Sequence, residues 1–172
     1  MPIKNPHPRI TMSLRLRNNF ILLLVAVLLF SCDEKRVFDE YKSVGSAWHK
    51  DSIVTFDLPE LDSTKRYNLF VNLRANNDYP FNNLFLIVAI ERPNGFTKVD
   101  TLEYLMANPD GSLLGDGFTD IKESKLFYKE KVRFRGNYKV HLKQAVRENG
   151  KVPGVTALEG ITDVGFRIEQ KD

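Results

Sequence analysis

A single cysteine, Cys32, offers the clearest chemistry in the chain, because it follows a long apolar segment directly. The residues Leu29-Phe30-Ser31-Cys32 form a lipobox, in which an aliphatic residue three positions before the cysteine and a small residue beside it admit the lipoprotein signal peptidase. Phe30 is bulkier than the small residue usual at its position. A chain with one cysteine forms no internal disulfide, and thioether attachment of a diacylglycerol would consume the thiol. We predict that Cys32 carries the lipid.

The segment before Cys32 has the features of a signal peptide. Its charged residues are all basic, and the apolar run 20–30 fills a signal-peptide core but is shorter than the ~20 residues that span a bilayer as a helix. We therefore predict a signal peptide over residues 1–31. Residues 1–11 contain several prolines and are atypical of such a segment, so we expect Met12 to be the true start.

The predicted signal peptide also changes the charge of the remaining chain. The whole sequence has 25 basic and 22 acidic residues. The predicted signal peptide contains no acidic residue, so the remaining chain is close to neutral, and nucleic acid is not indicated as a partner. The basic residues that leave with it are Lys4, Arg9, Arg15 and Arg17.

Other residues with catalytic potential form no recognisable motif. His49 and His141 have no second histidine or cysteine at metal-ligand spacing. Nucleophile-elbow, zinc-protease and phosphate-loop motifs are absent from the sequence, and no pair of carboxylates stands out for glycosidase chemistry. We therefore predict no enzymatic activity, no metal, no cofactor and no small-molecule substrate.

One segment of the sequence contains several aspartates that are candidate ligands for a calcium ion. Asp110, Asp116 and Asp120 lie in one glycine-rich segment and would bind Ca²⁺ if they converged, but their spacing departs from the EF-hand loop. Aspartate beside glycine is equally typical of tight turns. We favour turns.

The elements that must position these residues are strands. Apolar and polar residues alternate in most segments, whereas residues 84–90 are apolar throughout, as is typical of a strand covered on both faces. No segment has a convincing helical period. We predict an all-β fold, an antiparallel β-sandwich, immunoglobulin-like or jelly-roll, of seven to eight strands. Its boundaries are a lipidated amino terminus and tether at 32–50 and a sandwich domain at 51–172. The expected strands are 52–58, 67–74, 84–90, 99–106, 125–135, 138–142 and 162–168.

The longest connection between expected strands covers residues 107–124. Loops of this length are usually functional or disordered, and its apolar residues argue against disorder. One interpretation is that Leu113 and its apolar neighbours tuck under the edge of the sandwich. The other is that two apolar side chains bind a partner protein, with two carboxylates as a polar rim. The predicted partner-binding residues are Leu114, Asp116, Phe118 and Asp120.

Five blocks of sequence are similar to the gliding-motility lipoprotein GldH family. They cover nearly all of the chain after Cys32, and each is long enough to be specific. The lipobox fits the family as well, whereas the extended amino terminus departs from it. The blocks lie at 36–44 with Trp48 shortly after, 67–74, 82–88, 109–111 together with 115–130, and 158–169.

The resemblance implies a role in the surface-gliding machinery of Bacteroidota and in the associated type IX protein secretion. It implies a lipid-anchored envelope protein that works with other gliding lipoproteins, in an assembly or stabilising role. The family is not known as an enzyme, so the resemblance provides no catalytic residues.

The membrane that holds the lipid is predicted from the residues after Cys32. Asp33 and Glu34 are similar to surface-export signals of Bacteroidota, but Lys35 and Arg36 follow at once. We therefore expect an outer-membrane anchor with the domain facing the periplasm.

Glycan binding is the alternative function. Lipid-anchored β-sandwiches with exposed aromatic side chains often bind sugars. In that case the stacking residues would be Trp48, Tyr79 and Phe118.

Overall fold

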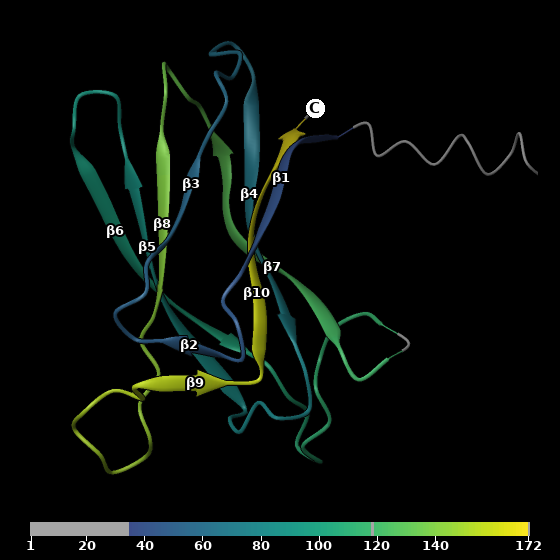
Figure 1. The fold of residues 1–172 in the computed structure, drawn as a ribbon. Coiled ribbons are helices and arrows are strands. Elements are labelled where there is room, and N and C mark those ends of the chain that lie inside the picture. Colours follow the sequence, from purple (N-terminus) through teal and green to yellow (C-terminus); the bar gives the residue numbers. More distant parts are fainter. Residues whose placement is uncertain (1–34, 118, 172) are drawn as a thin grey trace, which may run out of the picture. The chain divides into compact units, whose positions relative to one another are not determined.

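The computed structural model describes residues 35–117 and 119–171 (Figure 1). These residues are all-β, as predicted, and the antiparallel β-sandwich is confirmed, although the number of strands in the described part is ten rather than seven or eight. The strands are β1 (Arg36–Ser43), β2 (Ala47–His49), β3 (Val54–Asp57), β4 (Arg66–Ala75), β5 (Asn83–Glu91), β6 (Thr97–Leu105), β7 (Lys122–Val132), β8 (Lys139–Gln144), β9 (Ala157–Glu159) and β10 (Ile161–Lys171).

Two four-stranded sheets form the sandwich, with strand orders β1-β10-β4-β7 and β3-β8-β5-β6. All the pairings are antiparallel. The first and last of these eight strands are neighbours, and the chain changes sheets after most strands. This order is that of a jelly roll, which decides between the two predicted architectures. The short strands β2 and β9 form a separate pair that lies across one end of the sandwich (Figure 1).

Alternation determines which side chains of each strand enter the core. In β4, Tyr67, Leu69, Val71 and Leu73 are buried, while the residues between them point to the outer face of the sheet. The same alternation holds in β5, where every second residue is buried and Phe85, Ile87 and Ala89 are only half-buried. The prediction that residues 84–90 are covered on both faces is therefore wrong. An antiparallel sheet in a two-layer sandwich has one outer face.

The folded unit begins earlier than predicted. β1 pairs with β10 from Arg36 opposite Glu169 to Ser43 opposite Asp163, so residues assigned to a tether form part of a large sheet. The sequence analysis did not predict this strand because its residues are mostly polar and its side chains mostly half-buried, so it lacks a clear alternation of apolar and polar residues. The predicted signal peptide and Cys32 lie outside the described residues. Within residues 35–117 and 119–171, no helix is long and apolar enough to cross a membrane.

The core lies between the two sheets and continues under the β2–β9 pair. Trp48 of β2 is fully buried, and its Nε1 donates a hydrogen bond to the Ser52 carbonyl oxygen at 3.0 Å. Gly160, between β9 and β10, has φ +80° and lies so close to the chain at Tyr79 that a Cβ would be 2.1 Å from the Tyr79 nitrogen. Only glycine meets both conditions, so this turn fixes the entry into β10.

Candidate functional site

The predicted partner-binding loop is held by backbone hydrogen bonds at both ends. The Leu114 N–H donates to the Met106 carbonyl at 2.8 Å, and Asp116 and Glu123 exchange two backbone hydrogen bonds of 2.8 Å. Leu113 packs against the core, as the first interpretation of this loop expected. Leu114 is half-buried and Phe118 lies outside the described residues. The structure therefore places one of the two predicted apolar contacts near the surface and does not describe the other.

The acidic residues of this loop are exposed and do not converge. Asp110 accepts hydrogen bonds from the Ser112 hydroxyl at 2.6 Å and the Ser112 N–H at 2.9 Å, and these bonds lower the pKa of its carboxyl. Asp116 and Asp120 are exposed. In the described part of the chain, no group of three acidic, histidine or cysteine side chains is arranged to hold a metal ion. Asp110 thus acts as a turn residue.

A second polar region covers the outer face of the sheet β1-β10-β4-β7, and the sequence analysis missed it. Strand pairing sets its side chains in rows across the sheet, because residues opposite each other in neighbouring strands share a face. We call this region the paired-charge face. It consists of Asp39 and Tyr41 of β1, Arg167 and Glu169 of β10, Asn72 and Arg74 of β4, and Glu123 and Lys125 of β7.

Arg167 is at the centre of the paired-charge face. Its guanidinium donates to Asp39 Oδ2 at 2.8 Å and to Glu169 Oε1 at 2.6 Å. The three side chains are only 13–16% exposed, which is low for the outer face of a sheet. Lys125 Nζ adds a second bond to Glu169 at 2.5 Å, and Asn72 Nδ2 donates to Asp39 Oδ1 at 3.2 Å. Each carboxylate therefore has two side-chain donors.

These bonds shift the titration of Glu169. Burial alone would raise the pKa of its carboxyl, but the hydrogen bonds from Lys125 and Arg167 outweigh burial and hold the pKa below its ordinary value. The Glu169 carboxylate thus stays ionised near pH 7, in ion pairs with Lys125 and Arg167.

Tyr41 lies on the same face, over the glycine of the neighbouring strand. A Cβ on Gly165 would be 2.9 Å from the Tyr41 ring, so the absence of a side chain at residue 165 lets this ring lie close to the sheet. The Arg74 guanidinium lies 4.2 Å from the ring centroid and binds Glu123 at 3.0 Å. Burial, and then the nearby Glu123 carboxylate, raise the pKa of the Tyr41 hydroxyl. The hydroxyl therefore remains protonated near neutral pH and is not a candidate nucleophile.

An aromatic pair continues the face toward the edge strand β7. Phe70 and Phe127 meet edge to face with ring centroids 5.9 Å apart, and Phe127 is 54% exposed. Lys125 Nζ lies 4.2 Å from the Phe70 centroid. The paired-charge face and this aromatic pair make an ordered surface that a partner could contact with little loss of side-chain entropy.

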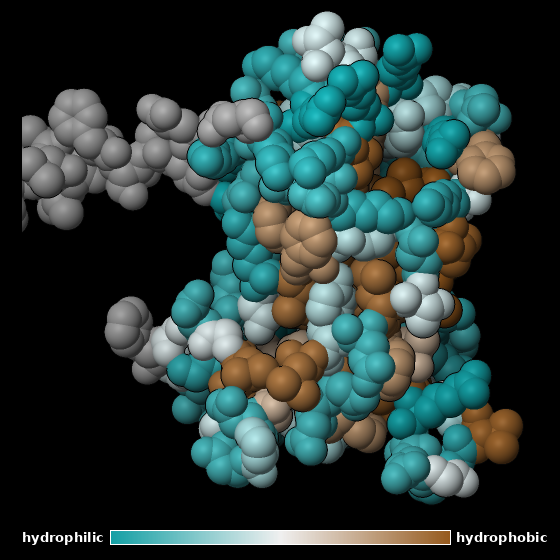
Figure 2. All heavy atoms as spheres, turned by 180° about the vertical axis from the view of Figure 1, so that it is seen from behind, coloured by the Kyte–Doolittle hydropathy of each residue, from teal (hydrophilic) through white to brown (hydrophobic). Residues whose placement is uncertain are grey.

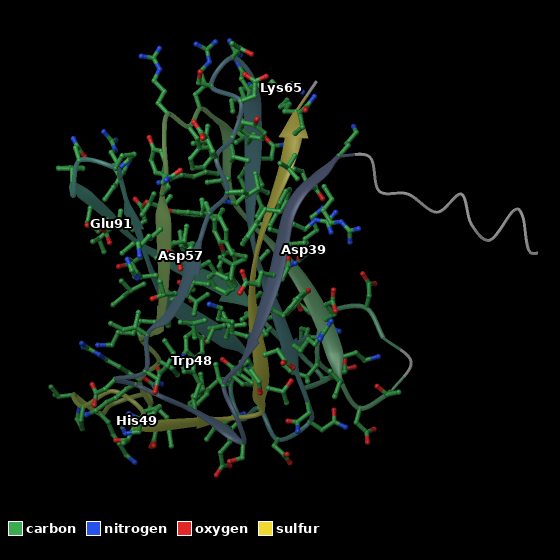
Figure 3. All side chains as sticks on the ribbon, turned by 45° about the horizontal axis from the view of Figure 1, so that its top comes forward. Asp39, Trp48, His49, Asp57, Lys65 and Glu91 are labelled. Carbon is green, nitrogen blue, oxygen red and sulfur yellow. The ribbon has the colours of Figure 1, made fainter. Side chains whose placement is uncertain are left out.

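The remaining residues that the sequence analysis considered for catalysis or sugar binding are two histidines and two aromatic residues. His141 bridges β3 and β5, with Nδ1 2.9 Å from the Thr55 hydroxyl and Nε2 3.1 Å from Glu91 Oε2. His49 is exposed beside Asp51 on the β2 side of the molecule (Figure 3). Trp48 and Tyr79, proposed as sugar-stacking residues, are buried, with 0% and 7% exposure. A sugar cannot stack on these two rings, so that part of the glycan hypothesis is wrong.

Known proteins similar to this chain point to one family. Residues 36–168 match the family model described as GldH lipoprotein. The chain is 82% identical over 159 residues to the gliding motility lipoprotein GldH of Flavobacterium johnsoniae, covering 92% of this chain and 100% of the relative. It is 57% identical over 155 residues to a gliding motility lipoprotein GldH homolog of Christiangramia forsetii, covering 89% of this chain and 95% of the relative.

A solved structure resembles the fold weakly. The dimeric latent PorU of Porphyromonas gingivalis aligns with a TM-score of 0.36 and 9% sequence identity, over 80% of this chain and 13% of that chain. The sequence relatives establish the family, because this chain matches them along nearly their whole length. The chain belongs to the GldH family of gliding-motility lipoproteins.

Proposed function

We propose that this lipoprotein is a non-catalytic component that assembles with, or stabilises, the gliding machinery and the associated type IX secretion apparatus. The observation that carries the proposal is the 82% identity to a gliding motility lipoprotein over that relative's full length. The structure adds support, because the ionic side chains of the paired-charge face bind one another across strands. Such a face suits contact with another protein.

The proposed partner surface begins in the loop that the sequence singled out. The side chains of Leu114, Asp116 and Asp120, together with Phe118, form its loop part. Glu123 connects this part to the paired-charge face, because its backbone binds Asp116 while its carboxylate binds Arg74. The loop and the face are thus neighbouring parts of one candidate surface.

Replacing both Leu114 and Phe118 by serine tests the loop part. A partner surface predicts normal abundance and an unchanged melting temperature together with lost gliding or secretion. Leu113→Ser is the matched core variant and should lower the melting temperature, because Leu113 packs against the core. Ile53→Ser with Val152→Ser is the matched surface control, since both side chains are largely exposed and neither belongs to this loop. A stable, fully motile Leu114→Ser/Phe118→Ser strain would remove the loop from the interface.

We further propose that the lipid is attached to Cys32 and that the domain faces the periplasm from the outer membrane. Cys32→Ala should leave the precursor uncleaved by the lipoprotein peptidase and abolish incorporation of labelled palmitate. Ser31→Ala is the control, because it keeps a small residue before the cysteine and should be processed normally. Palmitate incorporation into the Cys32→Ala protein would show that the lipobox assignment is wrong.

A further inference from the structure

A cavity with basic walls opens at one end of the sandwich, where β7 ends and β8 begins. It has a volume of about 410 Å³ and lies between the β5–β6 turn and the segment 132–138. Its floor is apolar, with buried Ile90 and Phe134. Figure 2 shows hydrophilic side chains gathered over this end, with hydrophobic atoms visible beneath them. The lining contains no acidic residue, whereas its basic residues are Arg92, Lys98, Lys129, Arg133 and Arg135.

Most of this positive charge is not neutralised within the described chain. Lys129 binds Asp100, and both side chains are about a quarter exposed. The other four basic residues are exposed, and none of them forms an ion pair with another residue of the described ranges. The carboxylates of Asp57, Glu60 and Glu91 line an adjoining cavity that shares Arg92 with this one, but they do not line this one. The four like charges around this concave site therefore produce a local positive potential that attracts anions.

The loops at the opposite end of the folded unit expose more acidic than basic side chains. Four of these exposed acidic side chains lie between residues 78 and 120. The β8–β9 loop at that end also exposes Arg147 and Lys151, and the β3–β4 loop at the basic end exposes Glu60 and Asp62. Charge is therefore separated along the sandwich in part. The four carboxylates are those of Asp78, Asp110, Asp116 and Asp120.

The basic end is also the end at which the chain enters the fold. The Gln170 N–H donates to the Lys35 carbonyl at 2.8 Å, and the end of β10 pairs with the start of β4 where Tyr67 faces Val132, the last residue of β7. Only Asp33 and Glu34 separate Lys35 from Cys32. A chain extends at most about 3.6 Å per residue, so their Cα atoms are at most about 11 Å apart. The cavity begins at Val132, three strands across the same end of the sheet from Lys35, which is about 14 Å at a strand spacing of about 4.8 Å. A lipid on Cys32 would therefore keep this whole end of the sheet close to the bilayer.

We propose that this basic end docks on the phosphate groups of anionic membrane lipids and so orients the domain on its membrane. The inference rests on the proposed lipid at Cys32, which would keep the basic end near the lipid headgroups. The guanidinium groups of Arg92, Arg133 and Arg135 suit phosphate oxygens, because their planar donors bind two oxygens at once. The acidic end and the proposed partner loop then point away from the bilayer.

Site-specific labelling of the purified, lipidated protein in vesicles tests the docking. The sequence contains one cysteine, which lipidation would consume, so Asn137→Cys provides a single labelling site at the basic end. Asn149→Cys, in an exposed turn elsewhere, is its matched control. The readout is quenching of the dye by headgroup-labelled lipid, in phosphatidylcholine vesicles with and without phosphatidylglycerol. We expect quenching at residue 137 only in the anionic vesicles and little at residue 149.

Charge variants then identify the residues. Each basic side chain near an anionic surface contributes about a fivefold gain in partitioning, so Arg133→Gln with Arg135→Gln should lower the docked-to-undocked ratio about 25-fold. Arg147→Gln with Lys151→Gln removes the same charge elsewhere and should change nothing. Equal quenching in neutral and anionic vesicles, equal quenching at both labels, or no response to Arg133→Gln/Arg135→Gln would overturn the proposal.

Two further measurements separate the alternatives. If inorganic phosphate releases the label where potassium chloride of equal ionic strength does not, the cavity is a free-phosphate site and the lipid assignment is wrong. Labelled palmitate on the same sample scores the anchor independently. A protein without palmitate would end the Cys32 assignment. Because its Cys32 thiol would then also take the dye, the docking is scored with Asn137→Cys on a Cys32→Ser background, where quenching only in anionic vesicles would uphold it.

Discussion

Arg167 shows how a single side chain organises the outer face of a sheet. Its planar guanidinium binds carboxylates on two strands, Asp39 at 2.8 Å and Glu169 at 2.6 Å. A lysine has no such fork and could not hold both geometries together. Without a cation here, two mostly buried carboxylates would lose a partner on neighbouring strands. We therefore interpret Arg167 as the residue that keeps β1 aligned on β10.

The titration of Glu169 makes this arrangement testable by pH. Its pKa in the folded chain lies below the ordinary value of 4.5, so its ion pairs stabilise the fold fully above about pH 4.5 and are lost as the pH falls through the folded pKa. Glu169→Gln should therefore cost roughly 1–2 kcal/mol near pH 7, and the difference from wild type should shrink in acid. Urea unfolding of both proteins at pH 7 and at several pH values below 4.5 measures this difference in unfolding free energy.

The control for this prediction is Glu60→Gln, which changes an exposed carboxyl in the same way. Its difference from wild type should stay small at every pH. A Glu169→Gln protein whose deficit is constant from neutral to acid would mean that the loss comes from packing and not from ionisation.

Gly165 contributes by having no side chain. A Cβ would lie 2.9 Å from the Tyr41 ring and 3.0 Å from the Glu40 carbonyl oxygen, so the ring or the strand must move. We expect Gly165→Ala to cost about 1–3 kcal/mol and to alter near-ultraviolet circular dichroism by displacing Tyr41. Gly154→Ala is the matched control, since its nearest atom would be 3.4 Å away. Equal stability of the two variants would show that β1 adapts freely.

At the scale of elements, β10 is the strand that joins the core to the paired-charge face. Phe166 is fully buried, and its ring centroid lies 6.3 Å from that of Phe56 on the facing sheet. Phe166→Ala should cost about 3–5 kcal/mol of unfolding free energy. Phe127→Ala is the matched control, because the same change at a 54% exposed ring should cost about 1 kcal/mol or less. Chemical denaturation of both variants decides whether β10 has its faces as described.

The fold was predictable where alternation and burial coincide, and the candidate site only in part. Val164, Phe166 and Ile168 recur at every second position of the predicted strand 162–168, and this alternation alone is enough to put them on the inward face, where they are buried. β1 was missed because it pairs with a partner about 120 residues away in the sequence, and local periodicity contains no information on that pairing. The same holds for the paired-charge face. Asn72 and Arg74 alternate with the apolar residues of β4, so alternation is enough to put them on its outer face, but Asp39 becomes a neighbour of Asn72 only through the sheet order.

At the scale of the molecule, charge is separated in part between the two ends of the sandwich. The basic cavity and the start of β1 are at one end, while the exposed acidic loops and the candidate partner loop are at the other. With the proposed docking, this polarity would orient the domain with its more acidic end away from the bilayer and toward the proposed partners. The arrangement is consistent with the non-catalytic assembly role proposed above.

The orientation of the domain across the outer membrane is the last prediction, and a protease can measure it. Lys151 lies in an exposed turn beside Val152, which is 85% exposed and belongs to the loop before β9, away from the point where the chain enters the fold. If the domain faces the periplasm, trypsin added to intact cells should leave it whole, and permeabilising the outer membrane should allow cleavage in this loop. Lys151→Gln should lose the cleavage at this turn in permeabilised cells, which identifies the site. Digestion of the domain in intact cells would instead place it on the cell surface, with the acidic end turned toward the substratum on which the cell moves.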